Sequence, residues 1–139
     1  MLPINYLAVL VAAVVAFIIG FLLHGPISGK LWMKLANIHP TGNEKLSNMI
    51  PQMLLNLLAN IISAYVLSVV YLFASTSPVM GGSGALNGIV CAFWVWLGFN
   101  VTATSMDVIW MGKSKGLWLF EAGASLIVFI AMGAIIASW

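Results

Sequence analysis

The sequence predicts an all-α integral membrane protein, a four-helix transmembrane bundle with a short interfacial amphipathic helix after the first span. Hydrophobic residues make up 63% of the 139 positions and charged residues only 6%, whereas a soluble domain carries about 25% charged residues. Mean hydropathy is +1.11. Four apolar stretches have the length of about 20 residues that crosses a bilayer as a helix. The alternation of a barrel strand is missing, and backbone groups in lipid must be bonded internally, so the stretches are predicted as helices.

The spans are predicted at residues 3–23, 51–74, 84–106 and 117–139, within a single domain that covers residues 1–139. Gly25-Pro26 is predicted to end the first span, Pro51 lies in the first turn of the second, and Gly81-Gly82 precedes the third. A cleaved signal peptide is the alternative for the first span, but a positive leading region is missing and the apolar run is too long.

The lysines predict the orientation of these spans. All five lie in the first and third loops, at Lys30, Lys34, Lys45, Lys113 and Lys115. By the positive-inside rule, loops 24–50 and 107–116 are expected in the cytoplasm and both termini outside. The chain has no arginine, so we expect no basic patch and no nucleic-acid partner.

The segment after the first span, "KLWMKLANI", is predicted to form a short amphipathic helix at the membrane surface. Leu31, Leu35 and Ile38 share one face, and Lys30, Lys34 and Asn37 share another. Lys30, Trp32 and Lys34 are therefore expected to anchor it in the headgroup layer. The alternative makes His24 and Trp32 part of a binding site, although a lone histidine at a helix end is more often interfacial. Cys91 is the only cysteine and no paired metal-ligand motif occurs, so neither a metal nor a cofactor is predicted.

Each span carries a ridge of small or polar residues, most of them spaced four apart. The first ridge is Ala8, Ala12, Ala16 and Gly20, and we expect it to be a central packing face. The others are Gln52, Asn56, Asn60, Ala64 and Ser68 in the second span, Gly84, Gly88 and Ala92 in the third, and Glu121, Ser125, Gly133 and Ala137 in the fourth. The pattern leaves open whether these ridges pack within one chain or between chains.

Polar residues concentrate in the half of the bundle that is predicted to face the cytoplasm. The candidate pocket consists of His24, Gln52, Asn56, Asn60, Asn100 and Glu121. One interpretation is a polar vestibule, and the other is hydrogen bonding that joins the helices. Glu121 is the sharpest candidate, although the helix N-terminus and nearby Lys113 also favour an anion there. If His24 and Glu121 meet, they would form a titratable pair.

Three stretches resemble a four-span bacterial and archaeal family catalogued as domain of unknown function 1761. They are "INYLAVLVAAVVAFIIGFLLHGPISGKLWMKL", "WLGF" and "WMGKSKGLWLFEAGASLIVFIAMGAIIASW". The family tends to have an aromatic residue in place of His24, an acid in place of Met111, and Asn or Asp in place of Glu121. The resemblance implies a four-helix membrane protein, here in a prokaryotic cytoplasmic (inner) membrane, and supplies no activity.

Three functions stay open. We expect a non-enzymatic accessory or structural subunit, associated with itself or with other membrane subunits in the lipid bilayer. The alternative is a small-solute transporter or channel that uses the polar half as its vestibule. A membrane enzyme acting on a lipid or quinone-like substrate is the third, but the catalytic motifs that would support it are missing.

Overall fold

Four long helices account for most of the molecule. The computed structural model describes residues 3–40, 42, 46–78 and 83–139. Its elements are α1 (Tyr6–Leu22), the π turn η1 (Leu23–Ile27), α2 (Gly29–Leu35), the 3₁₀ turn η2 (Leu46–Asn48), α3 (Ile50–Ser75), α4 (Ala85–Val95), the π turn η4 (Trp96–Val101), α5 (Thr102–Trp110) and α6 (Lys115–Ala137). Lys45 and Gly81-Gly82, used above for orientation and for a span boundary, lie outside the described residues.

The predicted fold class is confirmed. Four continuous helices are long and apolar enough to cross a membrane, at Tyr6–Ile27, Ile50–Ser75, Ala85–Trp110 and Lys115–Ala137. The third runs four residues past its predicted end, because α5 continues the helix through Asp107 to Trp110.

The prediction that Gly25-Pro26 ends the first helix is wrong, because the helix continues to Ile27, four residues past its predicted end. Pro26 lies inside the π turn η1, and the helical path ends only at Ile27. Proline has no backbone N–H and obstructs the regular i to i−4 pattern, whereas the wider π turn accommodates it. The Ser28 hydroxyl donates to the carbonyl oxygen of Leu23 at 2.7 Å, across the end of this turn.

The short helix α2 is present, but it is shorter than the amphipathic pattern implied. It ends at Leu35, and Asn37 takes a left-handed conformation with φ of 56°. The Ile38 N–H donates to the carbonyl of Met33 at 2.8 Å and the Asn37 N–H to that of Lys34 at 3.3 Å. This pair of bonds is a Schellman motif, in which Asn is tolerated at the left-handed position. Asn37 and Ile38 therefore belong to the turn rather than to the helical faces predicted for them.

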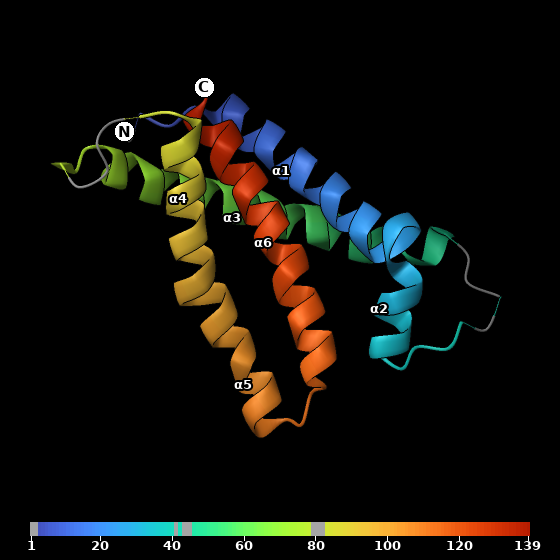
Figure 1. Cartoon of the computed structure of the whole chain (residues 1–139). Coiled ribbons are helices and arrows are strands. Elements are labelled where there is room, and N and C mark those ends of the chain that lie inside the picture. Colours follow the sequence, from blue (N-terminus) through green and yellow to red (C-terminus); the bar gives the residue numbers. More distant parts are fainter. Residues whose placement is uncertain (1–2, 41, 43–45, 79–82) are drawn as a thin grey trace.

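The helices converge at one end of the molecule and diverge at the other (Figure 1). The convergent end, here called the terminal end, carries both ends of the chain and the connection between α3 and α4. The opposite end, here called the lysine end, carries α2, the start of α3 and the turn between α5 and α6. A Cβ atom added to Gly116 of α6 would lie 3.2 Å from the Cδ2 of Leu35 in α2. These two segments of the lysine end are therefore neighbours.

Small side chains fill the core. Ala12, Ala64 and Ala92 have no exposed surface, and Leu67 and Met132 are only 1% exposed. Lipid offers no hydrophobic drive for helices to associate, so close packing of this kind must hold a membrane bundle together. Alanine allows it because its side chain is short and loses no rotamer freedom.

The backbones of α4 and α6 approach each other closely at two glycines. A Cβ on Gly88 would overlap the carbonyl oxygen of Gly133 and the methyl group of Ala137. A Cβ on Gly133 would overlap the carbonyl oxygen of Gly88 and lie 2.7 Å from the Cβ of Ala92. Only glycine fits at both positions, because carbon atoms need about 3.5 Å or more between them.

Burial falls along the ridges of α1 and α3 from the terminal end to the lysine end. On α1, Ala8, Ala12 and Ala16 are buried, whereas Gly20 is half-exposed and has nothing within 4 Å of its Cβ position. The ridge of α3 behaves in the same way. Ser68 and Ala64 are buried, Asn60 is half-buried, and Asn56 and Gln52 are exposed. These two ridges therefore pack within this chain where the helices converge, and they are less covered where the helices diverge, which leaves the polar members of the α3 ridge open.

We predict that Gly133→Ala destabilises the bundle by about 1–3 kcal/mol, because the added methyl group overpacks the contact with Gly88. Unfolding monitored by circular dichroism in mild detergent measures the effect. Gly123→Ala, on the same helix with nothing within 4 Å of its Cβ position, is the matched control and is expected to be neutral or stabilising. Equal stability of the two variants would contradict the assigned contact.

Candidate functional site

The diverging helices leave a cleft of about 490 Å³ at the lysine end. Four helices and two π turns are represented among its walls, which are lined by Ala16, Phe17, Gly20, Phe21, His24, Gly25, Trp32, Met49, Met53, Asn56, Asn60, Ser63, Asn100, Glu121, Ala124, Ser125, Val128, Phe129 and Met132. Both π turns reach it, through His24 of η1 and Asn100 of η4. Single π turns inside helices occur frequently at functional sites.

Five of the six residues proposed for a polar pocket line this one cleft. They are His24, Asn56, Asn60, Asn100 and Glu121. Gln52 does not line it. Gln52 is exposed, and its amide, oriented to satisfy both ends, donates to the backbone oxygens of Asn48 at 2.9 Å and Met49 at 3.2 Å.

Asn56 and Asn60 bond to each other rather than to a neighbouring helix. The Asn60 amide nitrogen donates to the side-chain oxygen of Asn56 at 2.9 Å and to its backbone oxygen at 3.0 Å. Both residues belong to α3. Among the residues that the structure describes, neither side chain forms a hydrogen bond to another helix. The interpretation of these two amides as links between helices is therefore not supported by their contacts.

Asn100, in contrast, does connect two helices. Its side-chain oxygen accepts a bond from the Ser125 hydroxyl of α6 at 3.1 Å. The Trp96 indole N–H, one turn earlier in η4, donates to the same Ser125 hydroxyl at 3.0 Å and to the backbone oxygen of Ala122 at 3.1 Å. Nearer the α5–α6 turn, the Trp118 indole donates to the Thr104 hydroxyl at 3.1 Å. These bonds fix the wall of the cleft that is formed by η4 and α6.

His24 is held between two aromatic rings. It meets Trp32 and Phe120 edge to face, with ring centroids 5.5 and 5.6 Å away. Its Nδ1 lies 2.9 Å from the backbone oxygen of Gly20. A carbonyl oxygen only accepts, so Nδ1 carries the proton, and in the neutral ring Nε2 is an acceptor. His24 lies in the same cleft as Glu121 and contacts its neighbour Phe120, but no bond between His24 and Glu121 is present.

Glu121 pairs with a lysine instead. The Nζ of Lys113 lies 2.5 Å from a carboxylate oxygen of Glu121 and 3.6 Å from one of Asp107. The hydrogen bond with Glu121, followed by the charges of both carboxylates, raises the pKa of Lys113 above its ordinary value of 10.5. One cation thus serves two anions at the mouth of the cleft, which accounts for a carboxylate in the first turns of α6.

The residues proposed as a surface anchor divide into two groups. Lys30 and Lys34 are exposed on α2. Trp32, between them, is half-buried, lines the cleft and contacts His24. His24 and Trp32 therefore lie next to each other in the same cleft, as the alternative interpretation expected of their positions.

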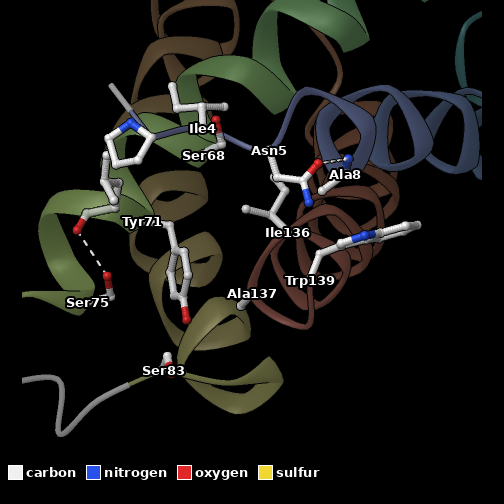
Figure 2. A pocket seen from close by; sticks show the side chains of 12 residues that line it. Ile4, Asn5, Ala8, Ser68, Tyr71, Ser75, Ser83, Ile136, Ala137 and Trp139 are labelled. Atoms are coloured by element: carbon white, nitrogen blue, oxygen red, sulfur yellow. Dashed lines mark hydrogen bonds between the residues drawn. The ribbon is translucent and has the colours of Figure 1, made fainter. Parts of the chain in front are cut away.

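A second, smaller pocket of about 270 Å³ lies at the terminal end, where Asn5, Tyr71, Ser83 and Trp139 are among its walls (Figure 2). Asn5 caps α1 by accepting from the backbone N–H groups of Leu7 and Ala8 at 3.1 and 3.2 Å. The backbone N–H of Gly84 donates to the Tyr71 hydroxyl oxygen at 3.1 Å. The first two bonds are local to the start of α1, and the third joins α3 to the start of α4.

Buried small side chains separate the two cavities. On α1, Ala8 lines the terminal pocket and Ala16 lines the cleft, while Ala12 between them has no exposed surface. On α3, Ala64 and Leu67 occupy the same level and are 0% and 1% exposed. Within the described part of the chain, the cleft thus ends at this layer.

Metal chemistry has no visible basis in the described residues. No group of three or more His, Cys, Asp or Glu side chains gathers there to hold an ion. Cys91 is buried in the apolar core beside Ala92.

The geometry can now be compared with known proteins. The family described as "Protein of unknown function (DUF1761)" matches residues 7–137. The chain belongs to this family. No curated protein and no solved structure matches it. The resemblance drawn from the sequence is thereby confirmed, and two of the stretches that carried it coincide with cleft elements: "WLGF" lies within η4, and the Gly-Pro segment lies within η1.

Trp96, Ser63 and Phe129 are among the residues that form or support the cleft of this DUF1761 member and that were not predicted from the sequence. Trp96 was not considered, although it precedes Asn100 by four residues and a buried indole needs an acceptor. Ser63 follows Asn60 by three residues on the same face of α3. Phe129 was passed over because one apolar residue in a span cannot be distinguished from its neighbours by pattern.

We predict that Lys113→Met lowers thermal stability by roughly 1 kcal/mol or less, since the pair is partly exposed and screened by solvent. The folded-state pKa of Lys113 is raised, so its stabilising effect is complete below 10.5 and is lost as pH rises through the folded value. Melting in detergent from neutral pH to about pH 12 should therefore show an alkaline decline in the wild type that Lys113→Met reduces.

Lys115→Met is the matched control for this measurement. Lys115 is exposed and forms no ion pair with the described residues. If both variants melt alike at every pH, the Lys113 contacts contribute nothing to stability.

Proposed function

We propose that this protein is a non-enzymatic accessory subunit of the membrane that works by holding a second molecule in the cleft at its lysine end. The single observation that supports this is the hydrogen bonding of the Asn56 and Asn60 side chains. Their amides face the cleft and bond only within α3. In hydrocarbon, a polar group without a partner costs several kcal/mol. An occupant that supplies hydrogen bonds would remove that cost.

The burial of the ridges favours the cleft over the ridges as the contact with a partner. Ala8, Ala12 and Ala16 are consumed by packing within the chain, as are Gly88 and Gly133. These small-residue faces are therefore not available as the interface of a homo-oligomer. Association with a second copy or another membrane subunit would have to use the cleft or the apolar outer faces.

The proposed orientation follows the lysines. Lys30, Lys34, Lys113 and Lys115 all belong to the lysine end. We propose that this end faces the cytoplasm, by the positive-inside rule, and that the membrane is a prokaryotic inner membrane. The cleft would then be reached from the cytoplasmic leaflet.

One observation supports transport as a second candidate. The cleft and the terminal pocket lie on opposite sides of a single buried layer that includes Ala12, Ala64 and Leu67. A transporter in a closed state would have this arrangement. Solute flux in proteoliposomes tests it: a transporter should lose flux in Asn56→Ala and Glu121→Gln, and unchanged flux in both would rule the candidate out.

The accessory role predicts a discrete neighbour in the cleft. A photoreactive residue, Met53→p-benzoylphenylalanine, should give one defined adduct in native membranes, because Met53 lines the cleft. The control is the same replacement of Leu58, which lies on α3, is 52% exposed and does not line the cleft.

Mass spectrometry of the adducts distinguishes the outcomes. A defined adduct at Met53 and mixed bulk lipid at Leu58 would support an occupied cleft. The same mixed lipid at both positions would overturn the proposal.

A further inference from the structure

We propose that the occupant of the cleft is an uncharged amphiphile whose head bears a carbonyl or hydroxyl oxygen, and that the amides of Asn56 and Asn100 hold that oxygen. The inference rests on the proposed function, since it names the molecule held in the same cleft. Three properties of the cleft lead to it: the direction of its open hydrogen bonds, its charge, and its size.

The open hydrogen-bonding groups of the cleft include two amide donors, on Asn56 and Asn100, beside acceptors on Asn60 and His24. The side-chain oxygen of Asn56 already accepts from Asn60, and that of Asn100 already accepts from Ser125. Each therefore keeps its NH₂ group for an occupant, because no bond from either nitrogen reaches a described residue. Two amide donors facing one cavity select an acceptor, which a carbonyl or hydroxyl oxygen provides. The Nε2 of His24, left as an acceptor, could receive the proton of a hydroxyl head.

The charge at the cleft mouth disfavours a charged head. In the turn between α5 and α6, the two positive charges of Lys113 and Lys115 are balanced by Asp107 and Glu121. Lys30 and Lys34 of α2 are exposed and do not line the cleft. Lys113 is already engaged by both carboxylates. A phosphate would find no unpaired cation among the described residues that line the cleft, and burying an unpaired charge is expensive.

The size and the apolar wall match a small amphiphile better than a protein segment. The volume of about 490 Å³ falls within the range of about 300–1,000 Å³ typical of small-molecule sites. One turn of a helix with side chains, about 10–12 Å wide and 5.4 Å high, already occupies about 420–610 Å³. A partner helix would therefore fit for a single turn only. Phe17, Phe21 and Phe129, with the adaptable side chain of Met53, can line a ring or the first part of an acyl chain.

Two sources of this chemistry are a neutral glycerolipid, which offers a hydroxyl and ester carbonyls, and a quinone, which offers ring carbonyls. The test is native mass spectrometry of the purified full-length chain in a neutral detergent, titrated with dioleoylglycerol, a short-chain quinone, or dioleoylphosphatidylglycerol. We expect one or both uncharged probes to bind with a 1:1 stoichiometry and more tightly than the phosphatidylglycerol. Equal or tighter binding of the anionic lipid, or no binding of either uncharged probe, would overturn the proposal.

The substitution Asn56→Leu tests whether the probe binds in the cleft. Loss of one neutral hydrogen bond should lower the binding affinity of the uncharged probe by about tenfold. Gln52→Leu makes the same change one turn away on the same helix, outside the cleft, and should leave binding unchanged. Asn56 is exposed and bonds only within α3, so both variants should melt like the wild type. Binding that is equal in the two variants would contradict the assignment.

The two experiments distinguish failure of this inference from failure of the proposed function. If neither uncharged probe binds while the adduct at Met53 persists, the cleft has an occupant of another class and only the present inference fails. If the adduct at Met53 is also mixed bulk lipid, both fail. His24→Phe separates the sources, because loss of Nε2 should weaken the hydroxyl-bearing lipid and spare the quinone.

Discussion

The backbone contact between Gly88 and Gly133 is the constraint on which the rest of the bundle depends. At this crossing α4 and α6 approach so closely that neither residue could carry a Cβ. Helices in lipid gain stability from such contacts rather than from hydrophobic burial. The contact lies near the terminal end, so the helices are held there and separate with distance from it (Figure 1). The cleft at the lysine end lies between the wall formed by η4 and α6 and the facing segments of α1, η1, α2 and α3.

The same divergence explains why one ridge can have two roles. Along α3, the buried Ala64 and Ser68 pack against other helices, whereas Asn56 and Asn60 reach the cleft and bond only to each other. A spacing of four residues keeps all of them on one face. The distance from that face to the next helix changes along α3. Where it is short the residues pack against the neighbouring helix, and where it is long their side chains are open to the cleft.

The polar groups of the cleft differ in how much of their bonding capacity is used. Glu121 is neutralised by Lys113, and Asn100 is fixed through Ser125. His24 is oriented by Gly20 and by two aromatic rings. This arrangement positions amide donors toward the cleft, and it is the physical basis on which we propose a binding role.

The sequence by itself determined the membrane class, the four helices and the presence of polar residues at one end, because span length and charge placement are local properties that lipid enforces strongly. It also indicated that Asn56, Asn60 and Asn100 belong to the same half of the bundle. Only the tertiary structure decided which of them join helices and which do not, because that depends on distances between segments far apart in the chain. It also decided that Glu121 meets Lys113 rather than His24, and that the helix passes through Pro26 in a π turn. The first of these outcomes follows from how closely two helices approach each other, which no pattern within a single span records.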